Sequence, residues 1–333
     1  MSLKKYHEFL FLLAFYALIF LLGLAVPGMW QPVALIMFYV ALGQCFNIFL
    51  GLTGYVDFGY VAFLALGAYG MAIAVELLHQ RGLGLMIIFI GLILAVIMSS
   101  LLSLAVGAVA LRLRGAYFAI ATIGVNEGFR YFVEGARLWG GSEGIIISGP
   151  LRQSLGPQTV NLLSTFVADV LVFIIAILAA FVTRQIINGK MGYALMALRE
   201  DEDAAKVIGI NVTRYKIIAF IISASFAGLL GACAWTLKMT YVFPADVFLI
   251  TYTIEAIAIV MLGGAGTLLG PAAGGVIYGV LKYYLAIKLP GLQLLILAPL
   301  LIMIIVMFPE GVVGTIKKRR CGSSGALKAG ECQ

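Results

Sequence analysis

The chain has 333 residues, of which 63% are apolar and 11% are charged, and its 22 basic and 15 acidic side chains give a net charge of +7. Soluble domains are roughly 45–50% apolar, so this composition excludes a soluble globular protein and predicts a polytopic membrane protein. Because mean hydropathy is +1.09, we attribute the positive charge to membrane topology and contact with the inner leaflet of the lipid bilayer, not to nucleic-acid binding.

Apolar runs along the chain predict an all-α polytopic membrane protein with about ten transmembrane or re-entrant helical segments. A spanning helix needs about 20 mostly apolar residues, and the ~10-residue alternating strands of a membrane β-barrel are absent. The runs cover residues 8–26, 33–50, 56–78, 86–110, 117–133, 166–186, 215–239, 247–262, 267–287 and 292–308. We expect one transmembrane domain over residues 1–316 and a basic, then flexible, cytoplasmic tail over residues 317–333.

The distribution of lysine and arginine predicts the orientation. With the N-terminus in the cytoplasm, fifteen of the 22 basic residues fall on cytoplasmic segments and seven on the opposite side, which agrees with the positive-inside rule. Ten crossings then return the C-terminus, with its KKRR cluster, to the cytoplasm. The sequence therefore predicts a multi-pass protein of the inner (plasma) membrane with both termini in the cytoplasm.

Two glycine-rich blocks each follow an apolar run at its predicted cytoplasmic end. Such glycines permit broken or re-entrant helices of the kind that line transport paths, although close packing of small residues between helices explains the same letters. The candidate path or helix-break residues in these blocks are Gly51, Gly54, Gly59, Gly263, Gly266, Gly270 and Pro271.

Three carboxylates lie within the predicted spans, where ionisable side chains are costly and often functional. Asp57 lies near a predicted membrane boundary, so a hydrated helix cap and a role in the path are both open. Glu127 stands three residues before Arg130, which predicts a structural ion pair on one helix face. Glu255 has no cation near it in sequence and is the candidate for an inward-facing polar residue, with interhelical hydrogen bonding as the alternative.

Residues 199–216, REDEDAAKVIGINVTRYK, concentrate eight charges in 18 positions between the sixth and seventh predicted spans. The loop over residues 190–213 is too long for a simple turn, and its pattern predicts a short helix along the membrane surface, with a solvated loop as the alternative. Gly209 is a natural end for that helix, and Asn211 with Thr213 supplies a cap for the next one. One side of the helix would carry Ala194, Leu195, Leu198, Ala205 and Ile208, with the acidic run toward water.

The same segment carries a resemblance to known transporters. The stretch DAAKVIG, Asp203 to Gly209, is similar to the EAA-x-x-x-G motif of ABC importer permeases, with Asp in place of the usual Glu. Further blocks are MGYALMALREDEDAAKVIGINVTRYKIIAFIISASFAGLLGA, GLTGYVDFGYVAFLALGAY, LRLRGAYFAIATIGVNEGFR, IVMLGGAGTLLGPAAGG and FPEGVVG, which occur between about residues 40 and 314. Together they resemble the branched-chain amino acid permease family of ABC importers, and in particular its LivM-type subunit.

This resemblance implies the ABC importer permease fold and transport of leucine, isoleucine or valine. It implies as partners a second homologous permease subunit, two ABC ATPase subunits and an extracytoplasmic substrate-binding protein. In the family, the cytoplasmic loop forms a coupling helix that docks into a groove on the ATPase, so we expect Ala204, Ala205 and Ile208 in that groove and the charged residues at its rim. The residues expected to couple to the ATPase are Arg199, Glu200, Asp201, Glu202, Asp203, Ala204, Ala205, Lys206, Ile208 and Gly209.

Motifs for chemistry are absent from the sequence. It contains no Walker A loop and no HExxH or GxSxG motif, and its four cysteines and two histidines lack metal-ligand spacing. We therefore expect a non-catalytic subunit without a cofactor or metal, and we assign no substrate-binding residue. Two alternatives stay open: an importer of urea or short-chain amides from the same superfamily, and an ion-coupled secondary transporter that would use carboxylates such as Asp57 and Glu255.

Overall fold

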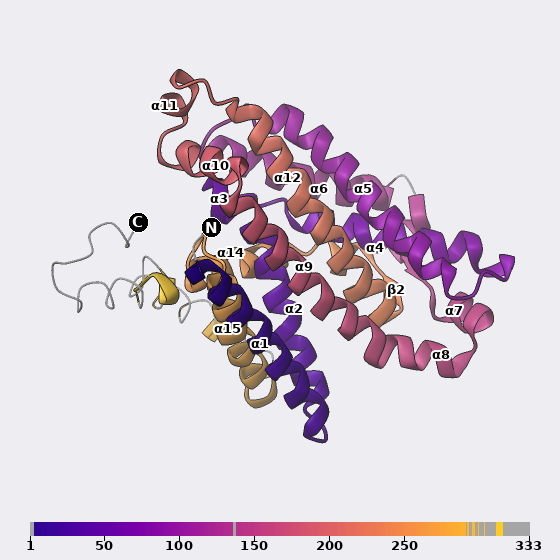
Figure 1. Cartoon of the computed structure of the whole chain (residues 1–333). Helices are drawn as coiled ribbons and strands as arrows, with labels where there is room; N and C mark the ends of the chain where they lie inside the picture. The colour runs from indigo at the N-terminus through magenta and orange to yellow at the C-terminus, as the bar shows by residue number, and fades with distance from the viewer. Residues whose placement is uncertain are drawn as a thin grey trace.

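The computed structural model describes residues 3–135, 138–290, 292, 295–296, 299, 303 and 311–315, and the chain is predominantly helical over these residues (Figure 1). The α-helices are α1 (Leu3–Ala25), α2 (Trp30–Asn47), α3 (Leu50–Thr53), α4 (Val61–Leu78), α5 (Met86–Ala110), α6 (Ala116–Gly135), α7 (Ser148–Leu155), α8 (Pro157–Leu162), α9 (Ala168–Asn188), α10 (Lys190–Glu200), α11 (Glu202–Val207), α12 (Val212–Gly231), α13 (Pro244–Val247), α14 (Thr251–Gly263) and α15 (Gly270–Lys288). The 3₁₀ helices are η1 (His79–Arg81) and η2 (Leu138–Glu143), and the π-helices are η3 (Leu163–Val167) and η4 (Ala232–Met239). The strands β1 (Ile145–Ile146) and β2 (Tyr241–Val242) pair antiparallel, with Ile145 opposite Val242.

Seven helical stretches within the described residues are long and apolar enough to cross a membrane. They run over His7–Ala25, Trp30–Thr53, Val61–Arg81, Met86–Ala110, Pro157–Asn188, Val212–Met239 and Pro244–Gly263. The prediction of an all-helical polytopic protein is confirmed, whereas the count of about ten segments is not.

The remaining three predicted segments explain the difference in number. The segment 117–133 is the helix α6, but Glu127, Arg130 and Glu134 make it less apolar than the seven spans. The segment 267–287 is the helix α15, which contains Lys282 and several glycines. The segment 292–308 and the predicted tail 317–333 fall largely or wholly outside the described residues.

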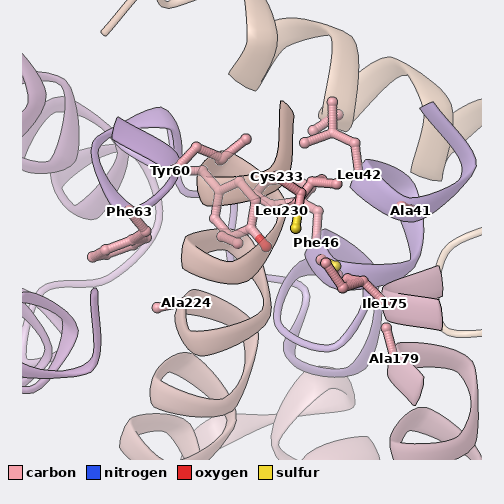
Figure 2. Close-up of a cluster of buried hydrophobic side chains, with 14 of the residues drawn as sticks. Ala41, Leu42, Phe46, Tyr60, Phe63, Ile175, Ala179, Ala224, Leu230 and Cys233 are labelled. Carbon is pink, nitrogen blue, oxygen red and sulfur yellow. The ribbon is translucent and has the colours of Figure 1, made fainter. Parts of the chain in front are cut away.

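Helices α2 and α4 form the centre of the bundle. The spans that contain them are 83% and 78% buried, whereas the α1 span is 17% buried and presents large apolar side chains outward. Helix α2 packs against α9, α14 and α15, and α4 packs against α5 and α12. Figure 2 shows part of this core, where Phe46, Phe63, Ile175 and Leu230 lie among the central helices. Outward apolar side chains on the peripheral helices are suited to lipid, because lipid-facing surfaces require no polar partner.

Glycines bring α4 and α12 into backbone contact. A Cβ atom at Gly67 would lie 2.0 Å from the carbonyl oxygen of Gly228, and one at Gly231 would lie 2.0 Å from that of Leu64. Small residues at helix interfaces allow this close approach in membranes. The Ser223 hydroxyl on α12 also donates to the Cys45 carbonyl on α2 at 2.7 Å. Helices α2, α4 and α12 therefore form a tightly joined centre that supports the loops at its ends.

The connecting segments gather at two ends of the bundle (Figure 1). The helices α10 and α11 join α9 to α12 at one end, and α10 packs there against α3. The helices α7 and α8 and the strand pair lie at the other end. We refer to the first as the α10–α11 end. Which end faces the cytoplasm stays a prediction.

Candidate functional site

The charged segment forms two helices where the sequence pattern predicted one. Between α10 and α11, Asp201 is extended at φ −154° and ψ 112°, which interrupts the helix. Its Oδ1 atom accepts hydrogen bonds from the backbone nitrogens of Asp203 at 2.8 Å and Ala204 at 3.0 Å. Aspartate is a favoured N-cap because its side chain satisfies amide groups that a helix start leaves free. Asp201 thus ends one helix and begins the next.

Helix α11 ends as the sequence predicted. Gly209 adopts φ +87°, a left-handed conformation that glycine enters without strain. Its amide donates to the Lys206 carbonyl at 3.0 Å, and the Ile210 amide donates to the Ala205 carbonyl at 3.0 Å, which together form a Schellman motif. The predicted cap by Asn211 is also confirmed, because its Oδ1 accepts from the Arg214 amide at 3.2 Å.

The apolar residues of the segment divide differently from the prediction. Ala194, Leu195, Leu198 and Ala205 are buried within this chain, but Ile208 is 72% exposed. Ile208 therefore does not share a side with Ala205, because Ile208 is the C-cap of α11, where the helical repeat ends. Ala204 is exposed as well, and so is Val207 at 87%, a residue that sequence reasoning missed. We call Ala204, Val207 and Ile208 the exposed apolar face of α11.

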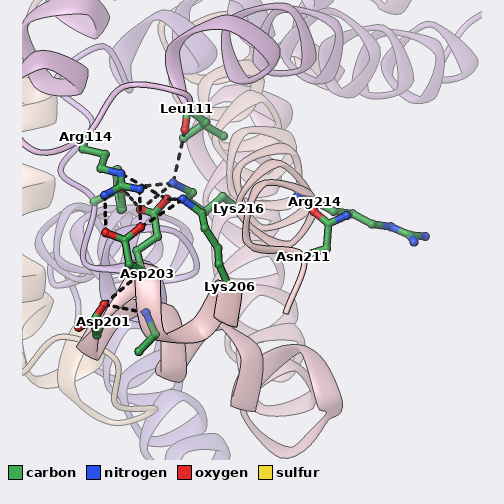
Figure 3. Close-up of polar contacts among 11 residues, drawn as sticks. Leu111, Arg114, Asp201, Asp203, Lys206, Asn211, Arg214 and Lys216 are labelled. Carbon is green, nitrogen blue, oxygen red and sulfur yellow. Dashed lines mark hydrogen bonds and ion pairs between the residues drawn. The ribbon is translucent and has the colours of Figure 1, made fainter. Parts of the chain in front are cut away.

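An ionic cluster fixes α11 to the rest of the chain (Figure 3). Glu202 accepts from the Tyr55 hydroxyl, from Lys206 at 2.9 Å and from Lys216 at 3.1 Å. Asp203 forms two hydrogen bonds with Arg114 of the α5–α6 turn, at 2.7 and 2.9 Å. The cluster consists of Tyr55, Arg114, Glu202, Asp203, Lys206 and Lys216. Two of the acidic residues expected at the rim of a partner therefore bind this chain's own cations.

The electrostatics of the cluster hold Glu202 ionised. Partial burial alone would raise the pKa of Glu202, but the hydrogen bonds from Tyr55, Lys206 and Lys216 outweigh it and lower the pKa to about 2. The hydrogen bonds and charge of Arg114 likewise lower the pKa of Asp203 below its usual value. Lys216 is 1% exposed, and removing one partner of a buried ion pair is strongly destabilising. The cluster is consequently a rigid base for α11.

Arg199, at the end of α10, connects this segment to both glycine-rich blocks. Its Nη1 atom donates to the Gly51 carbonyl at 2.8 Å and to the Ala265 carbonyl at 3.4 Å. The two blocks are also joined by Asn47, whose Oδ1 accepts from the Gly266 amide at 2.9 Å and whose Nδ2 donates to the Thr267 carbonyl at 3.1 Å. The predicted coupling residues and the predicted helix breaks thus form one continuous site.

Each glycine-rich block forms a turn at the end of a helix, and we call these two turns, at residues 51–54 and 263–266, the glycine turns. They show both properties that the sequence left open, helix breaks and close packing. Helix α3 ends at Gly54 with φ +74°, and α14 ends before Gly264 and Gly266 with φ +116° and +78°. At Gly51 a Cβ atom would lie 1.9 Å from Oδ1 of Asn47 and 2.6 Å from the amide nitrogen of Gly266. The glycines therefore permit the helix breaks and let the two turns touch.

The other predicted glycine-block residues lie in the same region. A Cβ at Gly59 would lie 2.3 Å from the Thr122 carbonyl oxygen, and one at Gly263 would lie 1.9 Å from that of Gly270. Gly270 begins α15, and Pro271 follows it in the first turn, where a missing amide hydrogen is tolerated.

The predicted carboxylates lie in three separate environments. Asp57 is buried beside the first glycine turn and accepts from the Gly59 amide at 2.8 Å, so it caps a local turn. The predicted ion pair between Glu127 and Arg130 is present at 3.7 Å, and Arg130 also binds Glu134 at 3.1 Å.

Glu255 has a partner that its sequence neighbourhood concealed. It is 2% exposed on α14 and forms an ion pair with Lys282 of the following helix α15. Because the two residues are 27 positions apart, the pair depends on the packing of α14 against α15. Glu255 is therefore bound between helices and is not an isolated inward-facing charge.

Several residues of the site escaped sequence reasoning. Lys216 carried a usable signal, because a lysine near the start of an apolar span requires a buried partner. Tyr55, Arg114 and Asn47 carried none, since their roles depend on contacts 89 to 219 residues away in sequence. The site is a helix with an exposed apolar face, mounted on ion pairs and joined to two helix breaks.

The seven apolar helical stretches define an all-helical, multi-pass membrane protein. The chain belongs to the family described as branched-chain amino acid transport system/permease component, whose match covers residues 29–307, and within that family it is of the LivM type. The seven apolar spans and the bacterial permeases that it resembles support an inner-membrane, multi-pass protein.

Curated relatives include two LivM proteins and one LivH protein. The high-affinity branched-chain amino acid transport system permease protein LivM of Salmonella typhimurium strain LT2 is 30% identical over 312 residues, which is 88% of this chain and 71% of that protein. LivM of Escherichia coli K12 is 29% identical over 314 residues, 88% of this chain and 72% of that protein. LivH of Escherichia coli K12 is 24% identical over 304 residues, 86% of this chain and 94% of that protein. No solved structure matches the chain.

Proposed function

We propose that the chain is the transmembrane permease subunit of an ATP-driven ABC importer for leucine, isoleucine and valine. It forms the translocation path with a second homologous permease subunit, and an extracytoplasmic binding protein delivers the substrate. Two ABC ATPase subunits hydrolyse ATP, so this chain is itself non-catalytic. The names of the LivM and LivH relatives support the substrate class and the presence of two permease types.

The observation that carries the coupling role is the exposed apolar face of α11. Val207, the last residue of α11, is 87% exposed, and Ile208, its C-cap, is 72% exposed. The six-residue helix is capped at both ends. Contiguous apolar side chains on a well-ordered surface outside the spans indicate a protein interface. A groove on the ATPase would cover Ala204, Val207 and Ile208, with Glu200 and Lys206 at its rim.

The contacts behind α11 suggest how its motion reaches the path. The ionic cluster ties α11 to α12 and to the α5–α6 turn, and Arg199 ties α10 to both glycine turns. When ATP binding draws two ATPases together, α10 and α11 would move as one unit and displace those turns. Such a movement is a rigid-body transition of packed elements.

The two alternative functions differ in how well the geometry suits them. An importer of urea or short-chain amides would share every feature described, because its specificity would reside on another polypeptide. An ion-coupled secondary transporter is less suited, because Lys282 already neutralises Glu255, the strongest candidate for ion coupling. The substrate distinction therefore needs a direct uptake measurement.

The test uses the chain expressed with its permease, ATPase and binding-protein neighbours. We expect Ile208→Glu to reduce ATPase recovery in a mild-detergent pull-down and ATP-driven leucine uptake in proteoliposomes by at least tenfold. Leu113→Glu is the matched control, since Leu113 is 40% exposed in the α5–α6 turn but lies outside α11. Normal ATPase recovery and uptake with Ile208→Glu would refute the coupling role. Competition of leucine uptake by valine, but not by urea or acetamide, would establish the substrate class.

A further inference from the structure

A cavity lies between α2, α9, η4 and α14 in the half of the bundle away from the α10–α11 end. Asp169 lies in the first turn of α9, and Lys238 lies in the last turn of η4, which continues α12. The helices α10 and α11 join the opposite ends of α9 and α12. The cavity has a volume of about 120 Å³. An engineered protein cavity of about 150 Å³ binds benzene, so this space suits an aliphatic side chain of about four carbons.

One wall of the cavity is ionic. Asp169 and Lys238 line it and form an ion pair in which the Asp169 side chain is 3% exposed. The indole nitrogen of Trp30 donates to the second carboxylate oxygen of Asp169 at 3.0 Å, which fixes its orientation. Lys238 is 25% exposed, and its hydrogen bond within the described residues goes to Asp169. An ammonium group has three donors, so Lys238 retains capacity for a further acceptor.

The other wall is aromatic and rigid. The rings of Trp235 and Tyr252 meet edge to face with centroids 5.0 Å apart, and those of Phe38 and Trp235 meet at 6.1 Å. Edge-to-face packing of this kind holds aromatic rings in fixed positions. Ala34 also lines the space and, being small, leaves it open. The cavity therefore has one apolar wall and one wall with both signs of charge.

We infer that this cavity is a transit site for a zwitterionic amino acid with a branched aliphatic side chain. The α-carboxylate binds Lys238, the α-ammonium lies on the side of Asp169, and the side chain packs on the rings of Phe38 and Trp235. The two charges of the ligand are then antiparallel to those of the ion pair, so no net charge is buried. The inference rests on the proposed function and adds the residues that contact the cargo.

The first test changes the space without changing the charge. Ala34→Val adds two methyl groups to the cavity wall and should lower the ratio of leucine to valine transport rates at least threefold at saturating binding protein. Ala41→Val is the matched control, because Ala41 is buried on the same helix but does not line the cavity. Equal ratios in the two variants would overturn the inference.

The second test removes the ion pair as a unit. The double variant Asp169→Asn/Lys238→Gln leaves no unpaired charge, and we expect at least a tenfold loss of leucine uptake while recovery of the ATPase subunits in a mild-detergent pull-down stays within twofold of wild type. Lys238→Arg keeps the charge and should retain at least a third of the uptake. Unchanged uptake in the double variant would contradict the assignment.

A binding measurement separates this inference from the proposed function. We expect saturation-transfer NMR to detect the methyl groups of L-leucine on the detergent-solubilised permease pair without binding protein, and to lose that signal in the double variant. An absent wild-type signal, or an equal one in the double variant, would refute the transit site. A wild-type complex that imports no branched-chain amino acid would refute the proposed function, whereas import insensitive to all cavity variants would refute the transit site alone.

Discussion

Replacing Arg199 should separate ATP hydrolysis from transport. In Arg199→Met the side chain keeps an unbranched apolar stem but loses the hydrogen bond from Nη1 to the Gly51 carbonyl at 2.8 Å and the longer one to Ala265 at 3.4 Å. A hydrogen bond from a charged donor contributes about 1.5–3 kcal/mol, and because Arg199 is exposed we take the lower end, about 1.5 kcal/mol. That energy corresponds to about a tenfold change in an equilibrium between two positions of the glycine turns.

The assay is the number of leucine molecules imported per ATP hydrolysed by the complete complex in proteoliposomes. We expect this ratio to fall about tenfold in Arg199→Met, with ATPase assembly and hydrolysis within twofold of wild type, because the ionic cluster and α11 are untouched. Arg112→Met is the matched control, since Arg112 is an exposed arginine in the α5–α6 turn. An unchanged ratio in Arg199→Met would show that Arg199 does not transmit movement to the glycine turns.

Three further outcomes follow from the structure. Gly209→Leu should weaken ATPase recovery and uptake, because a left-handed φ of +87° strains an L residue by about 1–2 kcal/mol, although no atom lies within contact of the added Cβ. Gly209→Asn should have a milder effect, because asparagine enters the left-handed region more readily. Equal effects of the two substitutions would contradict the strain argument. Because the pKa of Glu202 is lowered from 4.5 to about 2, its ionised form stabilises the protein above about pH 4.5 and this stabilisation is lost as the pH falls toward 2. The difference in thermal unfolding temperature between wild type and Glu202→Gln should therefore become smaller as the pH is lowered from 4.5 to about 2. A difference that stays constant over this pH range would show that ionised Glu202 does not stabilise the protein. Glu255→Gln should destabilise the detergent-solubilised protein by about 3 kcal/mol in thermal unfolding, because it leaves Lys282 without its partner. The double variant Glu255→Gln/Lys282→Met should restore most of the lost stability. Equal stability of wild type and Glu255→Gln would show that the ion pair has no structural role.

The local features of the site were predictable from sequence. Gly209 ends α11 and Asn211 begins α12 through hydrogen bonds to residues within five positions. The local sequence is therefore sufficient to predict both helix ends. The interruption at Asp201 is also local, but a continuous helical pattern concealed it. The predicted membrane body was correct in class because the length and apolarity of a segment determine whether it can cross a bilayer.

The burial of individual side chains was not predictable in the same way. Ala205 and Ile208 are three positions apart and were expected on one side, yet one is buried and the other exposed. Ile208 is the C-cap of α11, and a periodicity count that assumes one continuous helix does not include the end of the helix at Val207. Glu255 looked isolated for a different reason, since its partner Lys282 lies 27 positions away on another helix.

The sequence by itself therefore determined the membrane class, the position of the charged segment, the helix ends within it and the location of the glycine turns. Only the tertiary structure decided which residues meet: Arg199 with Gly51, Glu202 with Lys216, and Asp169 with Lys238. The physical reason is the separation in sequence between the residues that make each contact. Caps and turns are fixed by hydrogen bonds between near neighbours, whereas these contacts join segments 14 to 148 residues apart and exist only after the helices have packed.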